Sequence, residues 1–441
     1  MKLENFKNST TFRVIFIGFL ILLLLIPMGM VESVIVERGH LYRQANNEIT
    51  TSWGKEQLLI GPLLTIPYVK TFSDNAGWSY DSRYKHIRPE SMTINTNIET
   101  QIRHRSIYKV PVYTASVHVI GHFDLPGTGI SEENKSRFQL DEWVIQIPVK
   151  SSRSIKEPIK FVWDDEVIKL IPMRDDPSSE SVIFSAKLPP HLAGKDQGYK
   201  FEFHINLAGS GEFSFISSSQ NTNIKIDSDW ESPGFFGIYL PSSHDISDGG
   251  FTASWAINDL FTDLGHDKSK KVSYNWFSSK PRFGVKLIQP VDTYQVVTRA
   301  AKYAVLFIGL TFLVYFFTEL FGRALLHPIQ YLFVGVANCI FYLLLLSLAE
   351  HISFNIAYLI STCTSITLIS LYSINILKSR LKAFIVFIVL SGLYTYLFVT
   401  LRSEDFALLI GSIGLFIILG LAMYLTRNID WRKIDYEVQA E

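Results

Sequence analysis

The chain has 441 residues, of which 48% are hydrophobic and 14% aromatic, a high proportion for a soluble protein. Lysine plus arginine and aspartate plus glutamate each number 41, so the formal net charge is zero. This balance excludes the global basic field expected of a nucleic-acid-binding protein. Both cysteines, Cys339 and Cys363, lie in apolar runs, so we expect the polar middle of the chain to fold without a disulfide.

The first apolar run covers residues 14–31 and carries no charge. It is longer than the apolar part of a usual signal peptide, and no A-x-A-like cleavage site precedes Glu32, which favours an uncleaved signal anchor over a cleaved signal peptide. Lys2, Lys7 and Arg13 place residues 1–13 in the cytoplasm by the positive-inside rule. Spaced apolar residues among charges predict that the helix continues to about residue 53.

Residues 32–302 are predicted to be exported and rich in β-strands, because short runs of alternating polar and apolar residues recur every ten to fifteen residues or so. Turn-forming residues separate these runs, Asp164-Asp165 in one predicted hairpin and Gly209-Ser210-Gly211 in another. The pattern favours a β-sandwich or a pair of them, with residues 132–140 as a possible division and residues 251–264 ambiguous between helix and strand. The predicted strands lie in SMTINTNIETQI, YTASVHVIGHF, WVIQIPV, IKFVWDDEVIKLI, SVIFSAKL, YKFEFHINL, GEFSFI and FGVKLIQPV.

The C-terminal third is predicted to be a block of five membrane-spanning helices, at 303–321, 329–349, 352–377, 383–401 and 406–425. Together with residues 14–31 this makes six transmembrane α-helices, with the large exported, sandwich-like all-β domain inserted between helices 1 and 2. Basic residues in alternate loops, such as Lys378, Arg380 and Lys382, predict that both termini, including the tail 426–441, are cytoplasmic. The expected arrangement is therefore a multi-pass membrane protein with residues 32–302 outside the cytoplasm.

The boundary of the second predicted span carries ionisable residues. Glu319, Arg323 and His327 are four residues apart and would share one helix face, and Pro328 would close the following turn. Glu319 and Arg323 are predicted to form a boundary ion pair; the alternative is a functional relay. Further polar residues of the spans are interpreted as hydrogen-bonding between helices, with a polar pathway as the alternative: Asn338, Asn355, Asn375, Ser361, Thr362, Thr364, Ser365, Thr367 and Ser370.

No metal, cofactor or catalytic residue is predicted. His118 and His122 would share a face of a helix, but their surroundings indicate a strand, where four residues cover about 13 Å and one ion cannot bridge them. The acidic triplet 164–166 is interpreted as a solvated hairpin tip rather than a calcium site, because the extended acidic loop of such sites is missing. The motifs G-x-S-x-G, H-E-x-x-H and the P-loop do not occur in the sequence.

Several long stretches resemble the CreD family of bacterial inner-membrane proteins nearly end to end and in the same order: IPMGMVESVIVERGHLYRQA, GPLLTIPY, GFFGIYLP, GFTASW, TRAAKYAVLFIGLTF, LLHPIQYLFVG, FYLLLLSLAEHISFNIAY and TRNIDW. The resemblance implies an envelope protein located in the bacterial inner membrane, with residues 32–302 in the periplasm and both termini in the cytoplasm. The family's best-known member belongs to a two-component regulon that responds to carbon source and envelope stress, and is associated with tolerance to E-group colicins, envelope integrity and β-lactam response. The family has no established catalytic residues to carry over.

Three functions remain open at this point. The first is a non-enzymatic envelope-integrity protein whose β-region binds a partner protein, a lipid or a cell-wall component. The second is a transporter or lipid-handling protein, in which the helix block works with the β-domain. The third is an exported hydrolase or a sensor, for which the sequence contains neither a catalytic motif nor a cytoplasmic signalling domain. Beyond the lipid bilayer, the expected partners are an envelope protein or a lipid, and not nucleic acid.

Overall fold

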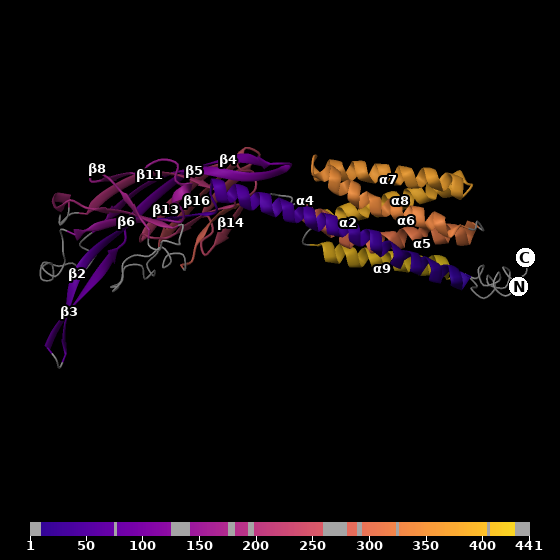
Figure 1. The fold of residues 1–441 in the computed structure, drawn as a ribbon, viewed down its shortest axis with the longest axis horizontal. Helices are drawn as coiled ribbons and strands as arrows, with labels where there is room; N and C mark the ends of the chain where they lie inside the picture. Colours follow the sequence, from indigo (N-terminus) through magenta and orange to yellow (C-terminus); the bar gives the residue numbers. More distant parts are fainter. Residues whose placement is uncertain are drawn as a thin grey trace, which may run out of the picture. The chain divides into compact units, whose positions relative to one another are not determined.

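The computed structural model describes residues 10–74, 77–124, 142–174, 181–192, 198–258, 280–288, 293–322, 326–403 and 406–427. The chain divides into two compact units (Figure 1). The helical unit comprises Met1–Gln44 and Val291–Glu441, and the β-unit comprises Ala45–Pro290. The β-unit lies inside the predicted limits 32–302, because residues 32–44 and the helix that follows residue 292 belong to the helical unit.

The described strands of the β-unit form two sheets. In the eight-stranded sheet the order is β15 (Ser243–Ser247), β16 (Gly250–Asn258), β13 (Asn221–Ser228), β4 (Ser91–Arg105), β5 (Tyr108–Phe123), β11 (Tyr199–Gly209), β7 (Lys160–Trp163) and β8 (Glu166–Ile168). In the nine-stranded sheet the order is β14 (Pro233–Gly237), β17 (Phe283–Leu287), β12 (Glu212–Ile216), β1 (Gln57–Ile60), β6 (Val144–Val149), β10 (Val182–Lys187) and β9 (Ile171–Met173). β2 (Leu63–Asp74) pairs with β6 and with β3 (Gly77–Ile87), which completes the nine strands. The described residues also include the 3₁₀ helices η4 (Ser152–Ser154) and η5 (Pro190–Leu192).

The two sheets share one hydrophobic core, as in a sandwich. In β4 every second residue from Met92 to Ile98 is buried and the intervening ones are exposed, which is the alternation seen in the sequence. Ile94 and Phe203 of the eight-stranded sheet belong to the same core cluster as Ile147 and Phe215 of the nine-stranded sheet. The predicted sandwich is therefore confirmed, and it forms one unit rather than two.

Two turn predictions have different outcomes. Asp164 and Asp165 have positive φ angles of 45° and 72° and join β7 to β8, so the predicted hairpin is confirmed. The second prediction is wrong: Gly209-Ser210-Gly211 connects β11 in one sheet to β12 in the other, and these strands are not paired. The same turn chemistry suits both arrangements, because a left-handed Gly211 (φ 70°) lets the chain either reverse or cross between layers.

The ambiguous segment 251–264 is a strand as far as residue 258, where it belongs to β16. Its remaining residues, and the proposed division at 132–140, lie outside the described residues.

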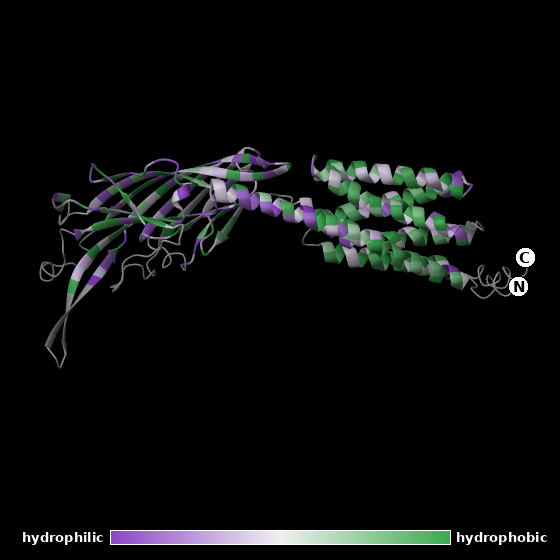
Figure 2. Ribbon diagram, in the orientation of Figure 1, coloured by the Kyte–Doolittle hydropathy of each residue, from purple (hydrophilic) through white to green (hydrophobic). Residues whose placement is uncertain are grey.

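In the described part of the helical unit there are one long helix and six shorter ones. α2 (Thr10–Trp53) reaches the predicted residue 53, and its residues up to Gln44 belong to this unit. The others are α4 (Thr293–Lys302), α5 (Ala304–Gly322), α6 (Pro328–Ala349), α7 (Phe354–Ile376), α8 (Arg380–Arg402) and α9 (Ala407–Thr426). Figure 2 shows that α5 to α9 are hydrophobic along most of their length, whereas α2 becomes hydrophilic towards its C-terminal end.

Among the described residues, five helices are long and apolar enough to cross a membrane: α2, α6, α7, α8 and α9. α4 and α5 together pass the same test as a pair bent by 46°, so the number rises to six if that pair is one span. The sequence did not predict α4 as a separate helix. It is amphipathic and buries Val296, Val297, Ala300 and Ala301 in the core of the unit.

Candidate functional site

Glu319 in the last turn of α5 is the centre of a buried polar cluster. Its side chain is only 6% exposed, and Nη1 of Arg13 on α2 lies 3.0 Å from its Oε1. The Tyr331 hydroxyl on α6 donates to Oε2 at 2.8 Å, and the backbone N–H of Leu326 donates to Oε1 at 3.4 Å. Because both carboxylate oxygens are bonded to donors from other segments, the cluster fastens α2, α5 and α6 together.

The neighbours of Glu319 along the chain differ from those predicted. α5 ends at Gly322, so His327 does not share its helix face as predicted; it is the N-cap of α6, where its Nδ1 accepts from the N–H of Ile329 at 3.3 Å. Pro328 begins the new helix, because proline fits its first turn and not the interior of the preceding one. Arg323 lies outside the described residues, so its pairing with Glu319 remains a prediction.

A second cluster ties a later part of α2 to the other end of α6. Glu350, the C-cap of α6, has a side chain 10% exposed; Tyr294 of α4 donates to it at 3.2 Å, and Nε of Arg38 lies 3.9 Å away. The rings of Tyr42 and Tyr294 are 5.5 Å apart. Arg13 and Arg38 are separated by about 38 Å along the helix axis at about 1.5 Å per residue, so the stretch between the two clusters is long enough to cross a hydrocarbon layer about 30 Å thick.

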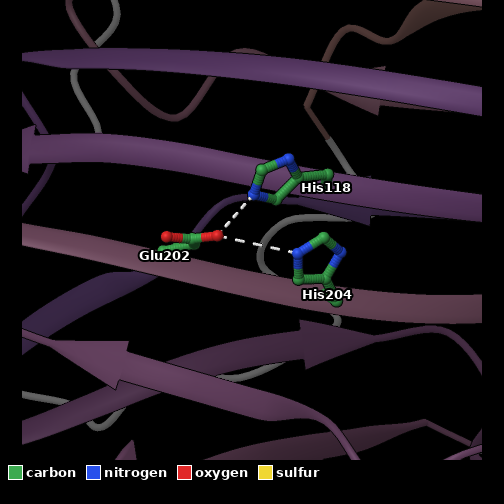
Figure 3. A group of neighbouring side chains, drawn as sticks. All are labelled: His118, Glu202 and His204. Atoms are coloured by element: carbon green, nitrogen blue, oxygen red, sulfur yellow. Dashed lines mark hydrogen bonds and ion pairs between the residues drawn. The ribbon is translucent and has the colours of Figure 1, made fainter. Parts of the chain in front are cut away.

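A third group of ionisable residues lies on the eight-stranded sheet (Figure 3). His118 Nε2 is 2.7 Å from Glu202 Oε1, and His204 Nε2 is 3.6 Å from the same oxygen. The two imidazole rings are stacked with centroids 3.9 Å apart. His118 comes from β5 and the other two from β11, and one ligand atom of each lies within 4.8 Å of the others. These are therefore residues that could hold a metal ion, and the sequence pattern did not single them out together.

His118 and His122 both lie on β5, so the prediction that they occupy a strand is confirmed, and His122 does not belong to the group. The signal available in the sequence was the spacing of Glu202 and His204, because residues two apart in a strand face the same side. His118 is their neighbour because β5 pairs with β11. His118 and Glu202 are 84 residues apart in the sequence, so no local pattern shows this contact.

The comparisons with known proteins agree over nearly the whole chain. The family model described as "Inner membrane protein CreD" matches residues 9–432. The chain belongs to the CreD family. The inner membrane protein CreD of Escherichia coli K12 is 31% identical over 416 residues, which is 93% of this chain and 91% of that protein.

Among solved structures, an M1 zinc metallopeptidase of Deinococcus radiodurans matches 45% of this chain and 42% of its own, with 8% identity and a TM-score of 0.22. This level of likeness carries no argument about fold or function.

Some polar residues inside the helical unit of this CreD-family chain are hydrogen-bonded between helices, whereas the buried hydroxyls of Ser361 and Ser370 have no hydrogen-bond partner among the described residues. The Tyr394 hydroxyl on α8 donates to Asn338 Oδ1 on α6 at 3.3 Å, and the Tyr358 hydroxyl on α7 donates to the Tyr394 carbonyl at 2.7 Å. Asn338 is fully buried, whereas Asn355 and Asn375 are exposed on the helix surface. The predicted interhelical role therefore holds for Asn338.

An apolar groove runs between α5, α8 and α9. It consists of two cavities of 440 Å³ and 240 Å³, and Leu310 and Leu393 line both. Lys382 lines the larger cavity, and Tyr396, Thr400 and Ser412 line the smaller one. A groove of this size and polarity suits a hydrocarbon chain.

Proposed function

We propose that this chain is a CreD-type inner-membrane protein that supports envelope integrity under stress, including colicin tolerance, and that it works without catalysis. In this proposal the β-unit binds another envelope protein, and the helical unit anchors it. Family membership over residues 9–432 supports the general role. The observation that carries the binding mode is an uncovered polar face of the eight-stranded sheet.

This polar face is formed by the outward residues of the strands whose inward residues build the core. Strand pairing places Asn95 opposite His118, His118 opposite His204, and Asn95 opposite Lys225, so one row of polar side chains crosses four strands. The exposed or half-buried polar residues of the face are Thr93, Asn95 and Asn97 on β4, Ser116, His118 and His122 on β5, Glu202, His204 and Asn206 on β11, and Asn221, Asn223, Lys225 and Asp227 on β13.

The size of the polar face suits a protein partner. The four strands that carry these residues are three spacings apart; at about 4.8 Å each, and with about eight residues of 3.3 Å along the strands, they cover about 380 Å². The outward side of the neighbouring strands β15, β16 and β7 extends the surface to about 760 Å². A standard protein–protein interface buries about 800 Å² on each partner. Its amide, hydroxyl and imidazole groups favour a hydrogen-bonding partner over the apolar chains of a lipid.

The proposed orientation places the β-unit in the periplasm and both termini in the cytoplasm. Lys378, Arg380 and Lys382 lie between or at the adjoining ends of α7 and α8, on the side expected to carry basic residues. Glu350 and His351 lie between α6 and α7, on the opposite side of the proposed membrane. A periplasmic β-unit would meet envelope proteins directly.

The test is genetic complementation with arginines placed on the polar face. In a strain that lacks its own copy, the Asn95→Arg/Asn223→Arg variant should accumulate normally in the membrane and fail to restore survival under detergent and chelator stress. Exposed positions tolerate such changes with little loss of stability, within about 0.5 kcal/mol. The control is Ile171→Arg, on an exposed position of the nine-stranded sheet. Full rescue by the double variant would refute binding through this face.

A second candidate function is lipid handling, which the apolar groove between α5, α8 and α9 favours. A phospholipid acyl chain lying against Leu310 and Leu393 would join both cavities. Protein moved through two detergents should keep a stoichiometric lipid, measured by mass spectrometry. Leu310→Trp or Leu393→Trp should fill the groove and release it, whereas Phe384→Trp, on an exposed position of α8, should not. Wild-type protein that carries no lipid would remove this candidate.

A further inference from the structure

We propose that His118, Glu202 and His204 bind one zinc ion on the polar face of the eight-stranded sheet (Figure 3). The inference does not depend on the proposed function, because it concerns binding of the metal and not of a partner.

Strand register brings the three side chains together. His204 on β11 is directly opposite His118 on β5, so their side chains rise from the same face of the sheet as immediate neighbours. Glu202 precedes His204 by two residues and therefore shares that face. The backbone pairing of β5 with β11 extends over eleven residue pairs, from Tyr199–Phe123 to Gly209–Tyr113, so the positions of the ligands are fixed by a long regular ladder.

The distances fit one small ion. Zinc lies about 2.0–2.2 Å from histidine nitrogen and carboxylate oxygen, so tetrahedral ligand atoms are about 3.3 Å apart. The separations from Glu202 Oε1 are 2.7 Å to His118 Nε2 and 3.6 Å to His204 Nε2, and one ligand atom of each residue lies within 4.8 Å of the others. Binding requires the two stacked rings, whose planes are 7° apart, to rotate until their Nε2 lone pairs converge, and side chains that are 30–57% exposed have room for this rotation.

The ligand set selects the class of metal. Two imidazoles and one carboxylate suit zinc and its neighbours among the divalent transition metals, whereas calcium and magnesium prefer oxygen ligands throughout. Three protein ligands leave a fourth position for water or for another donor, as in zinc sites that are not purely structural. The filled d shell of zinc imposes no ligand-field preference, so its tetrahedral coordination tolerates moderate distortion.

Two other histidines of the β-unit, His122 and His191, lack the three converging ligands of this group. His122 lies on the same strand and face, but it is not part of the three-residue group. His191 contacts Glu166 at 3.1 Å, and this pair belongs to no three-ligand group among the described residues. A pair of donors holds a metal ion far more weakly than three converging ones, so both histidines serve as controls.

The experiment uses the full-length protein in detergent, with any histidine tag removed and bound metal stripped by a chelator that is then dialysed away. Zinc titration by calorimetry should give saturable binding of one ion per chain. His118→Ala and His204→Ala should each weaken this binding at least about tenfold, because each removes a direct ligand. Glu202→Gln should weaken it as well, since the neutral amide is a poorer ligand than the carboxylate. His122→Ala and His191→Ala should bind zinc as the wild type does.

Cobalt provides an independent readout of geometry. Co²⁺ in place of zinc should give intense visible absorption bands typical of four-coordinate nitrogen and oxygen ligands in the wild type and the His122→Ala variant, and these bands should be lost in His118→Ala. The circular dichroism spectrum of each variant checks that the sheets are intact. Wild-type protein without saturable zinc binding would overturn the proposal, and so would unchanged binding in folded His118→Ala or an equal loss in His122→Ala.

Discussion

At the scale of single residues, Glu319 shows how a charge is held among apolar helices. Its pairing with Arg13 predicts that the two side chains depend on each other. Arg13→Gln and Glu319→Gln should each lower the thermal midpoint of the protein in detergent, because each leaves a charge without its partner. The loss of stability in the double variant should be smaller than the sum of the losses in the two single variants, with a coupling free energy of about 1–3 kcal/mol.

The control for this double-mutant cycle is Lys187 with Glu142, a pair 3.9 Å apart whose side chains are 60% and 52% exposed. Its coupling should be close to zero, because water screens both charges. Strictly additive effects at Arg13 and Glu319 would mean that the contact does not stabilise the helical unit.

Tyr113 in the β-unit gives a prediction about pH. Its side chain is fully buried, and its hydroxyl donates to the Glu212 carbonyl at 2.7 Å. Burial raises the pKa of this phenol well above its usual 10.0, and the negative charge of Glu212 acts in the same direction. The folded protein therefore keeps a proton that the unfolded chain releases above about pH 10. Tyr113 stabilises the fold fully below that pH, and this contribution declines as the pH rises further.

Tyr113→Phe should consequently cost about 1 kcal/mol of stability at pH 8, where a buried hydrogen bond is lost. The difference between wild type and variant should shrink at pH 10.5, because the wild type alone pays for keeping this phenol neutral. Thermal unfolding of the full-length protein, followed by circular dichroism of the strands, measures both values. A constant difference at the two pH values would contradict the assignment.

Sequence and structure diverge most at the level of contacts between distant residues. The alternation of β4 and the long uncharged runs of the spans are local patterns, so strands and helices could be predicted. Arg13 and Glu319 are 306 residues apart, and no local pattern links them. The sequence shows the spacing of His118 and His122, but His122 is not the histidine that lies beside His118. The register of β5 against β11 places His204 there.

At the scale of elements, the packing of α2 against α6 depends on Gly335. A Cβ atom at this position would lie 2.1 Å from Leu24 Cδ1 of α2 and 2.9 Å from Phe312 Cζ of α5. Gly335→Leu should therefore force the helices apart and lower the thermal midpoint in detergent, at a cost of about 1–3 kcal/mol. The loss should appear as earlier aggregation on heating.

Gly392 on α8 is the matched control, because a Cβ there meets nothing within 4 Å. Gly392→Leu should leave stability unchanged or raise it slightly, since leucine favours a helix over glycine by up to about 1 kcal/mol. If both substitutions have the same effect, close approach at Gly335 is not what holds α2 in place.

The order of the strands in the two sheets could not be predicted from the sequence either. β1 pairs in parallel with β12, and β4 with β13, although each pair is separated by more than a hundred residues. Parallel neighbours need a crossover of the chain, which leaves no trace in the local alternation of polar and apolar residues. This is why a turn such as Gly209-Ser210-Gly211 was interpreted as a hairpin when it leads from one sheet to the other.

At the scale of the whole molecule, the distribution of charge predicts the orientation in the membrane. Alkaline phosphatase fused after Leu425 should be inactive, because this end is proposed to be cytoplasmic. The same enzyme inserted between Asp248 and Gly249, at the exposed turn between β15 and β16, should be active. Activity at the first position would contradict six spans, and inactivity at the second, with normal protein abundance, would contradict a periplasmic β-unit.

The polar face of the β-unit is proposed to bind an envelope protein. The most direct test places a photo-crosslinking amino acid at Asn95 or Asn223 on this face, and at Ile171 on the other sheet as a control, in intact cells. Proteins and lipids recovered after irradiation are identified by mass spectrometry. We expect the same envelope protein from both face positions and not from Ile171, and we expect the product at one face position to be lost when the other carries arginine. Lipid alone, or no product at either face position, would contradict it.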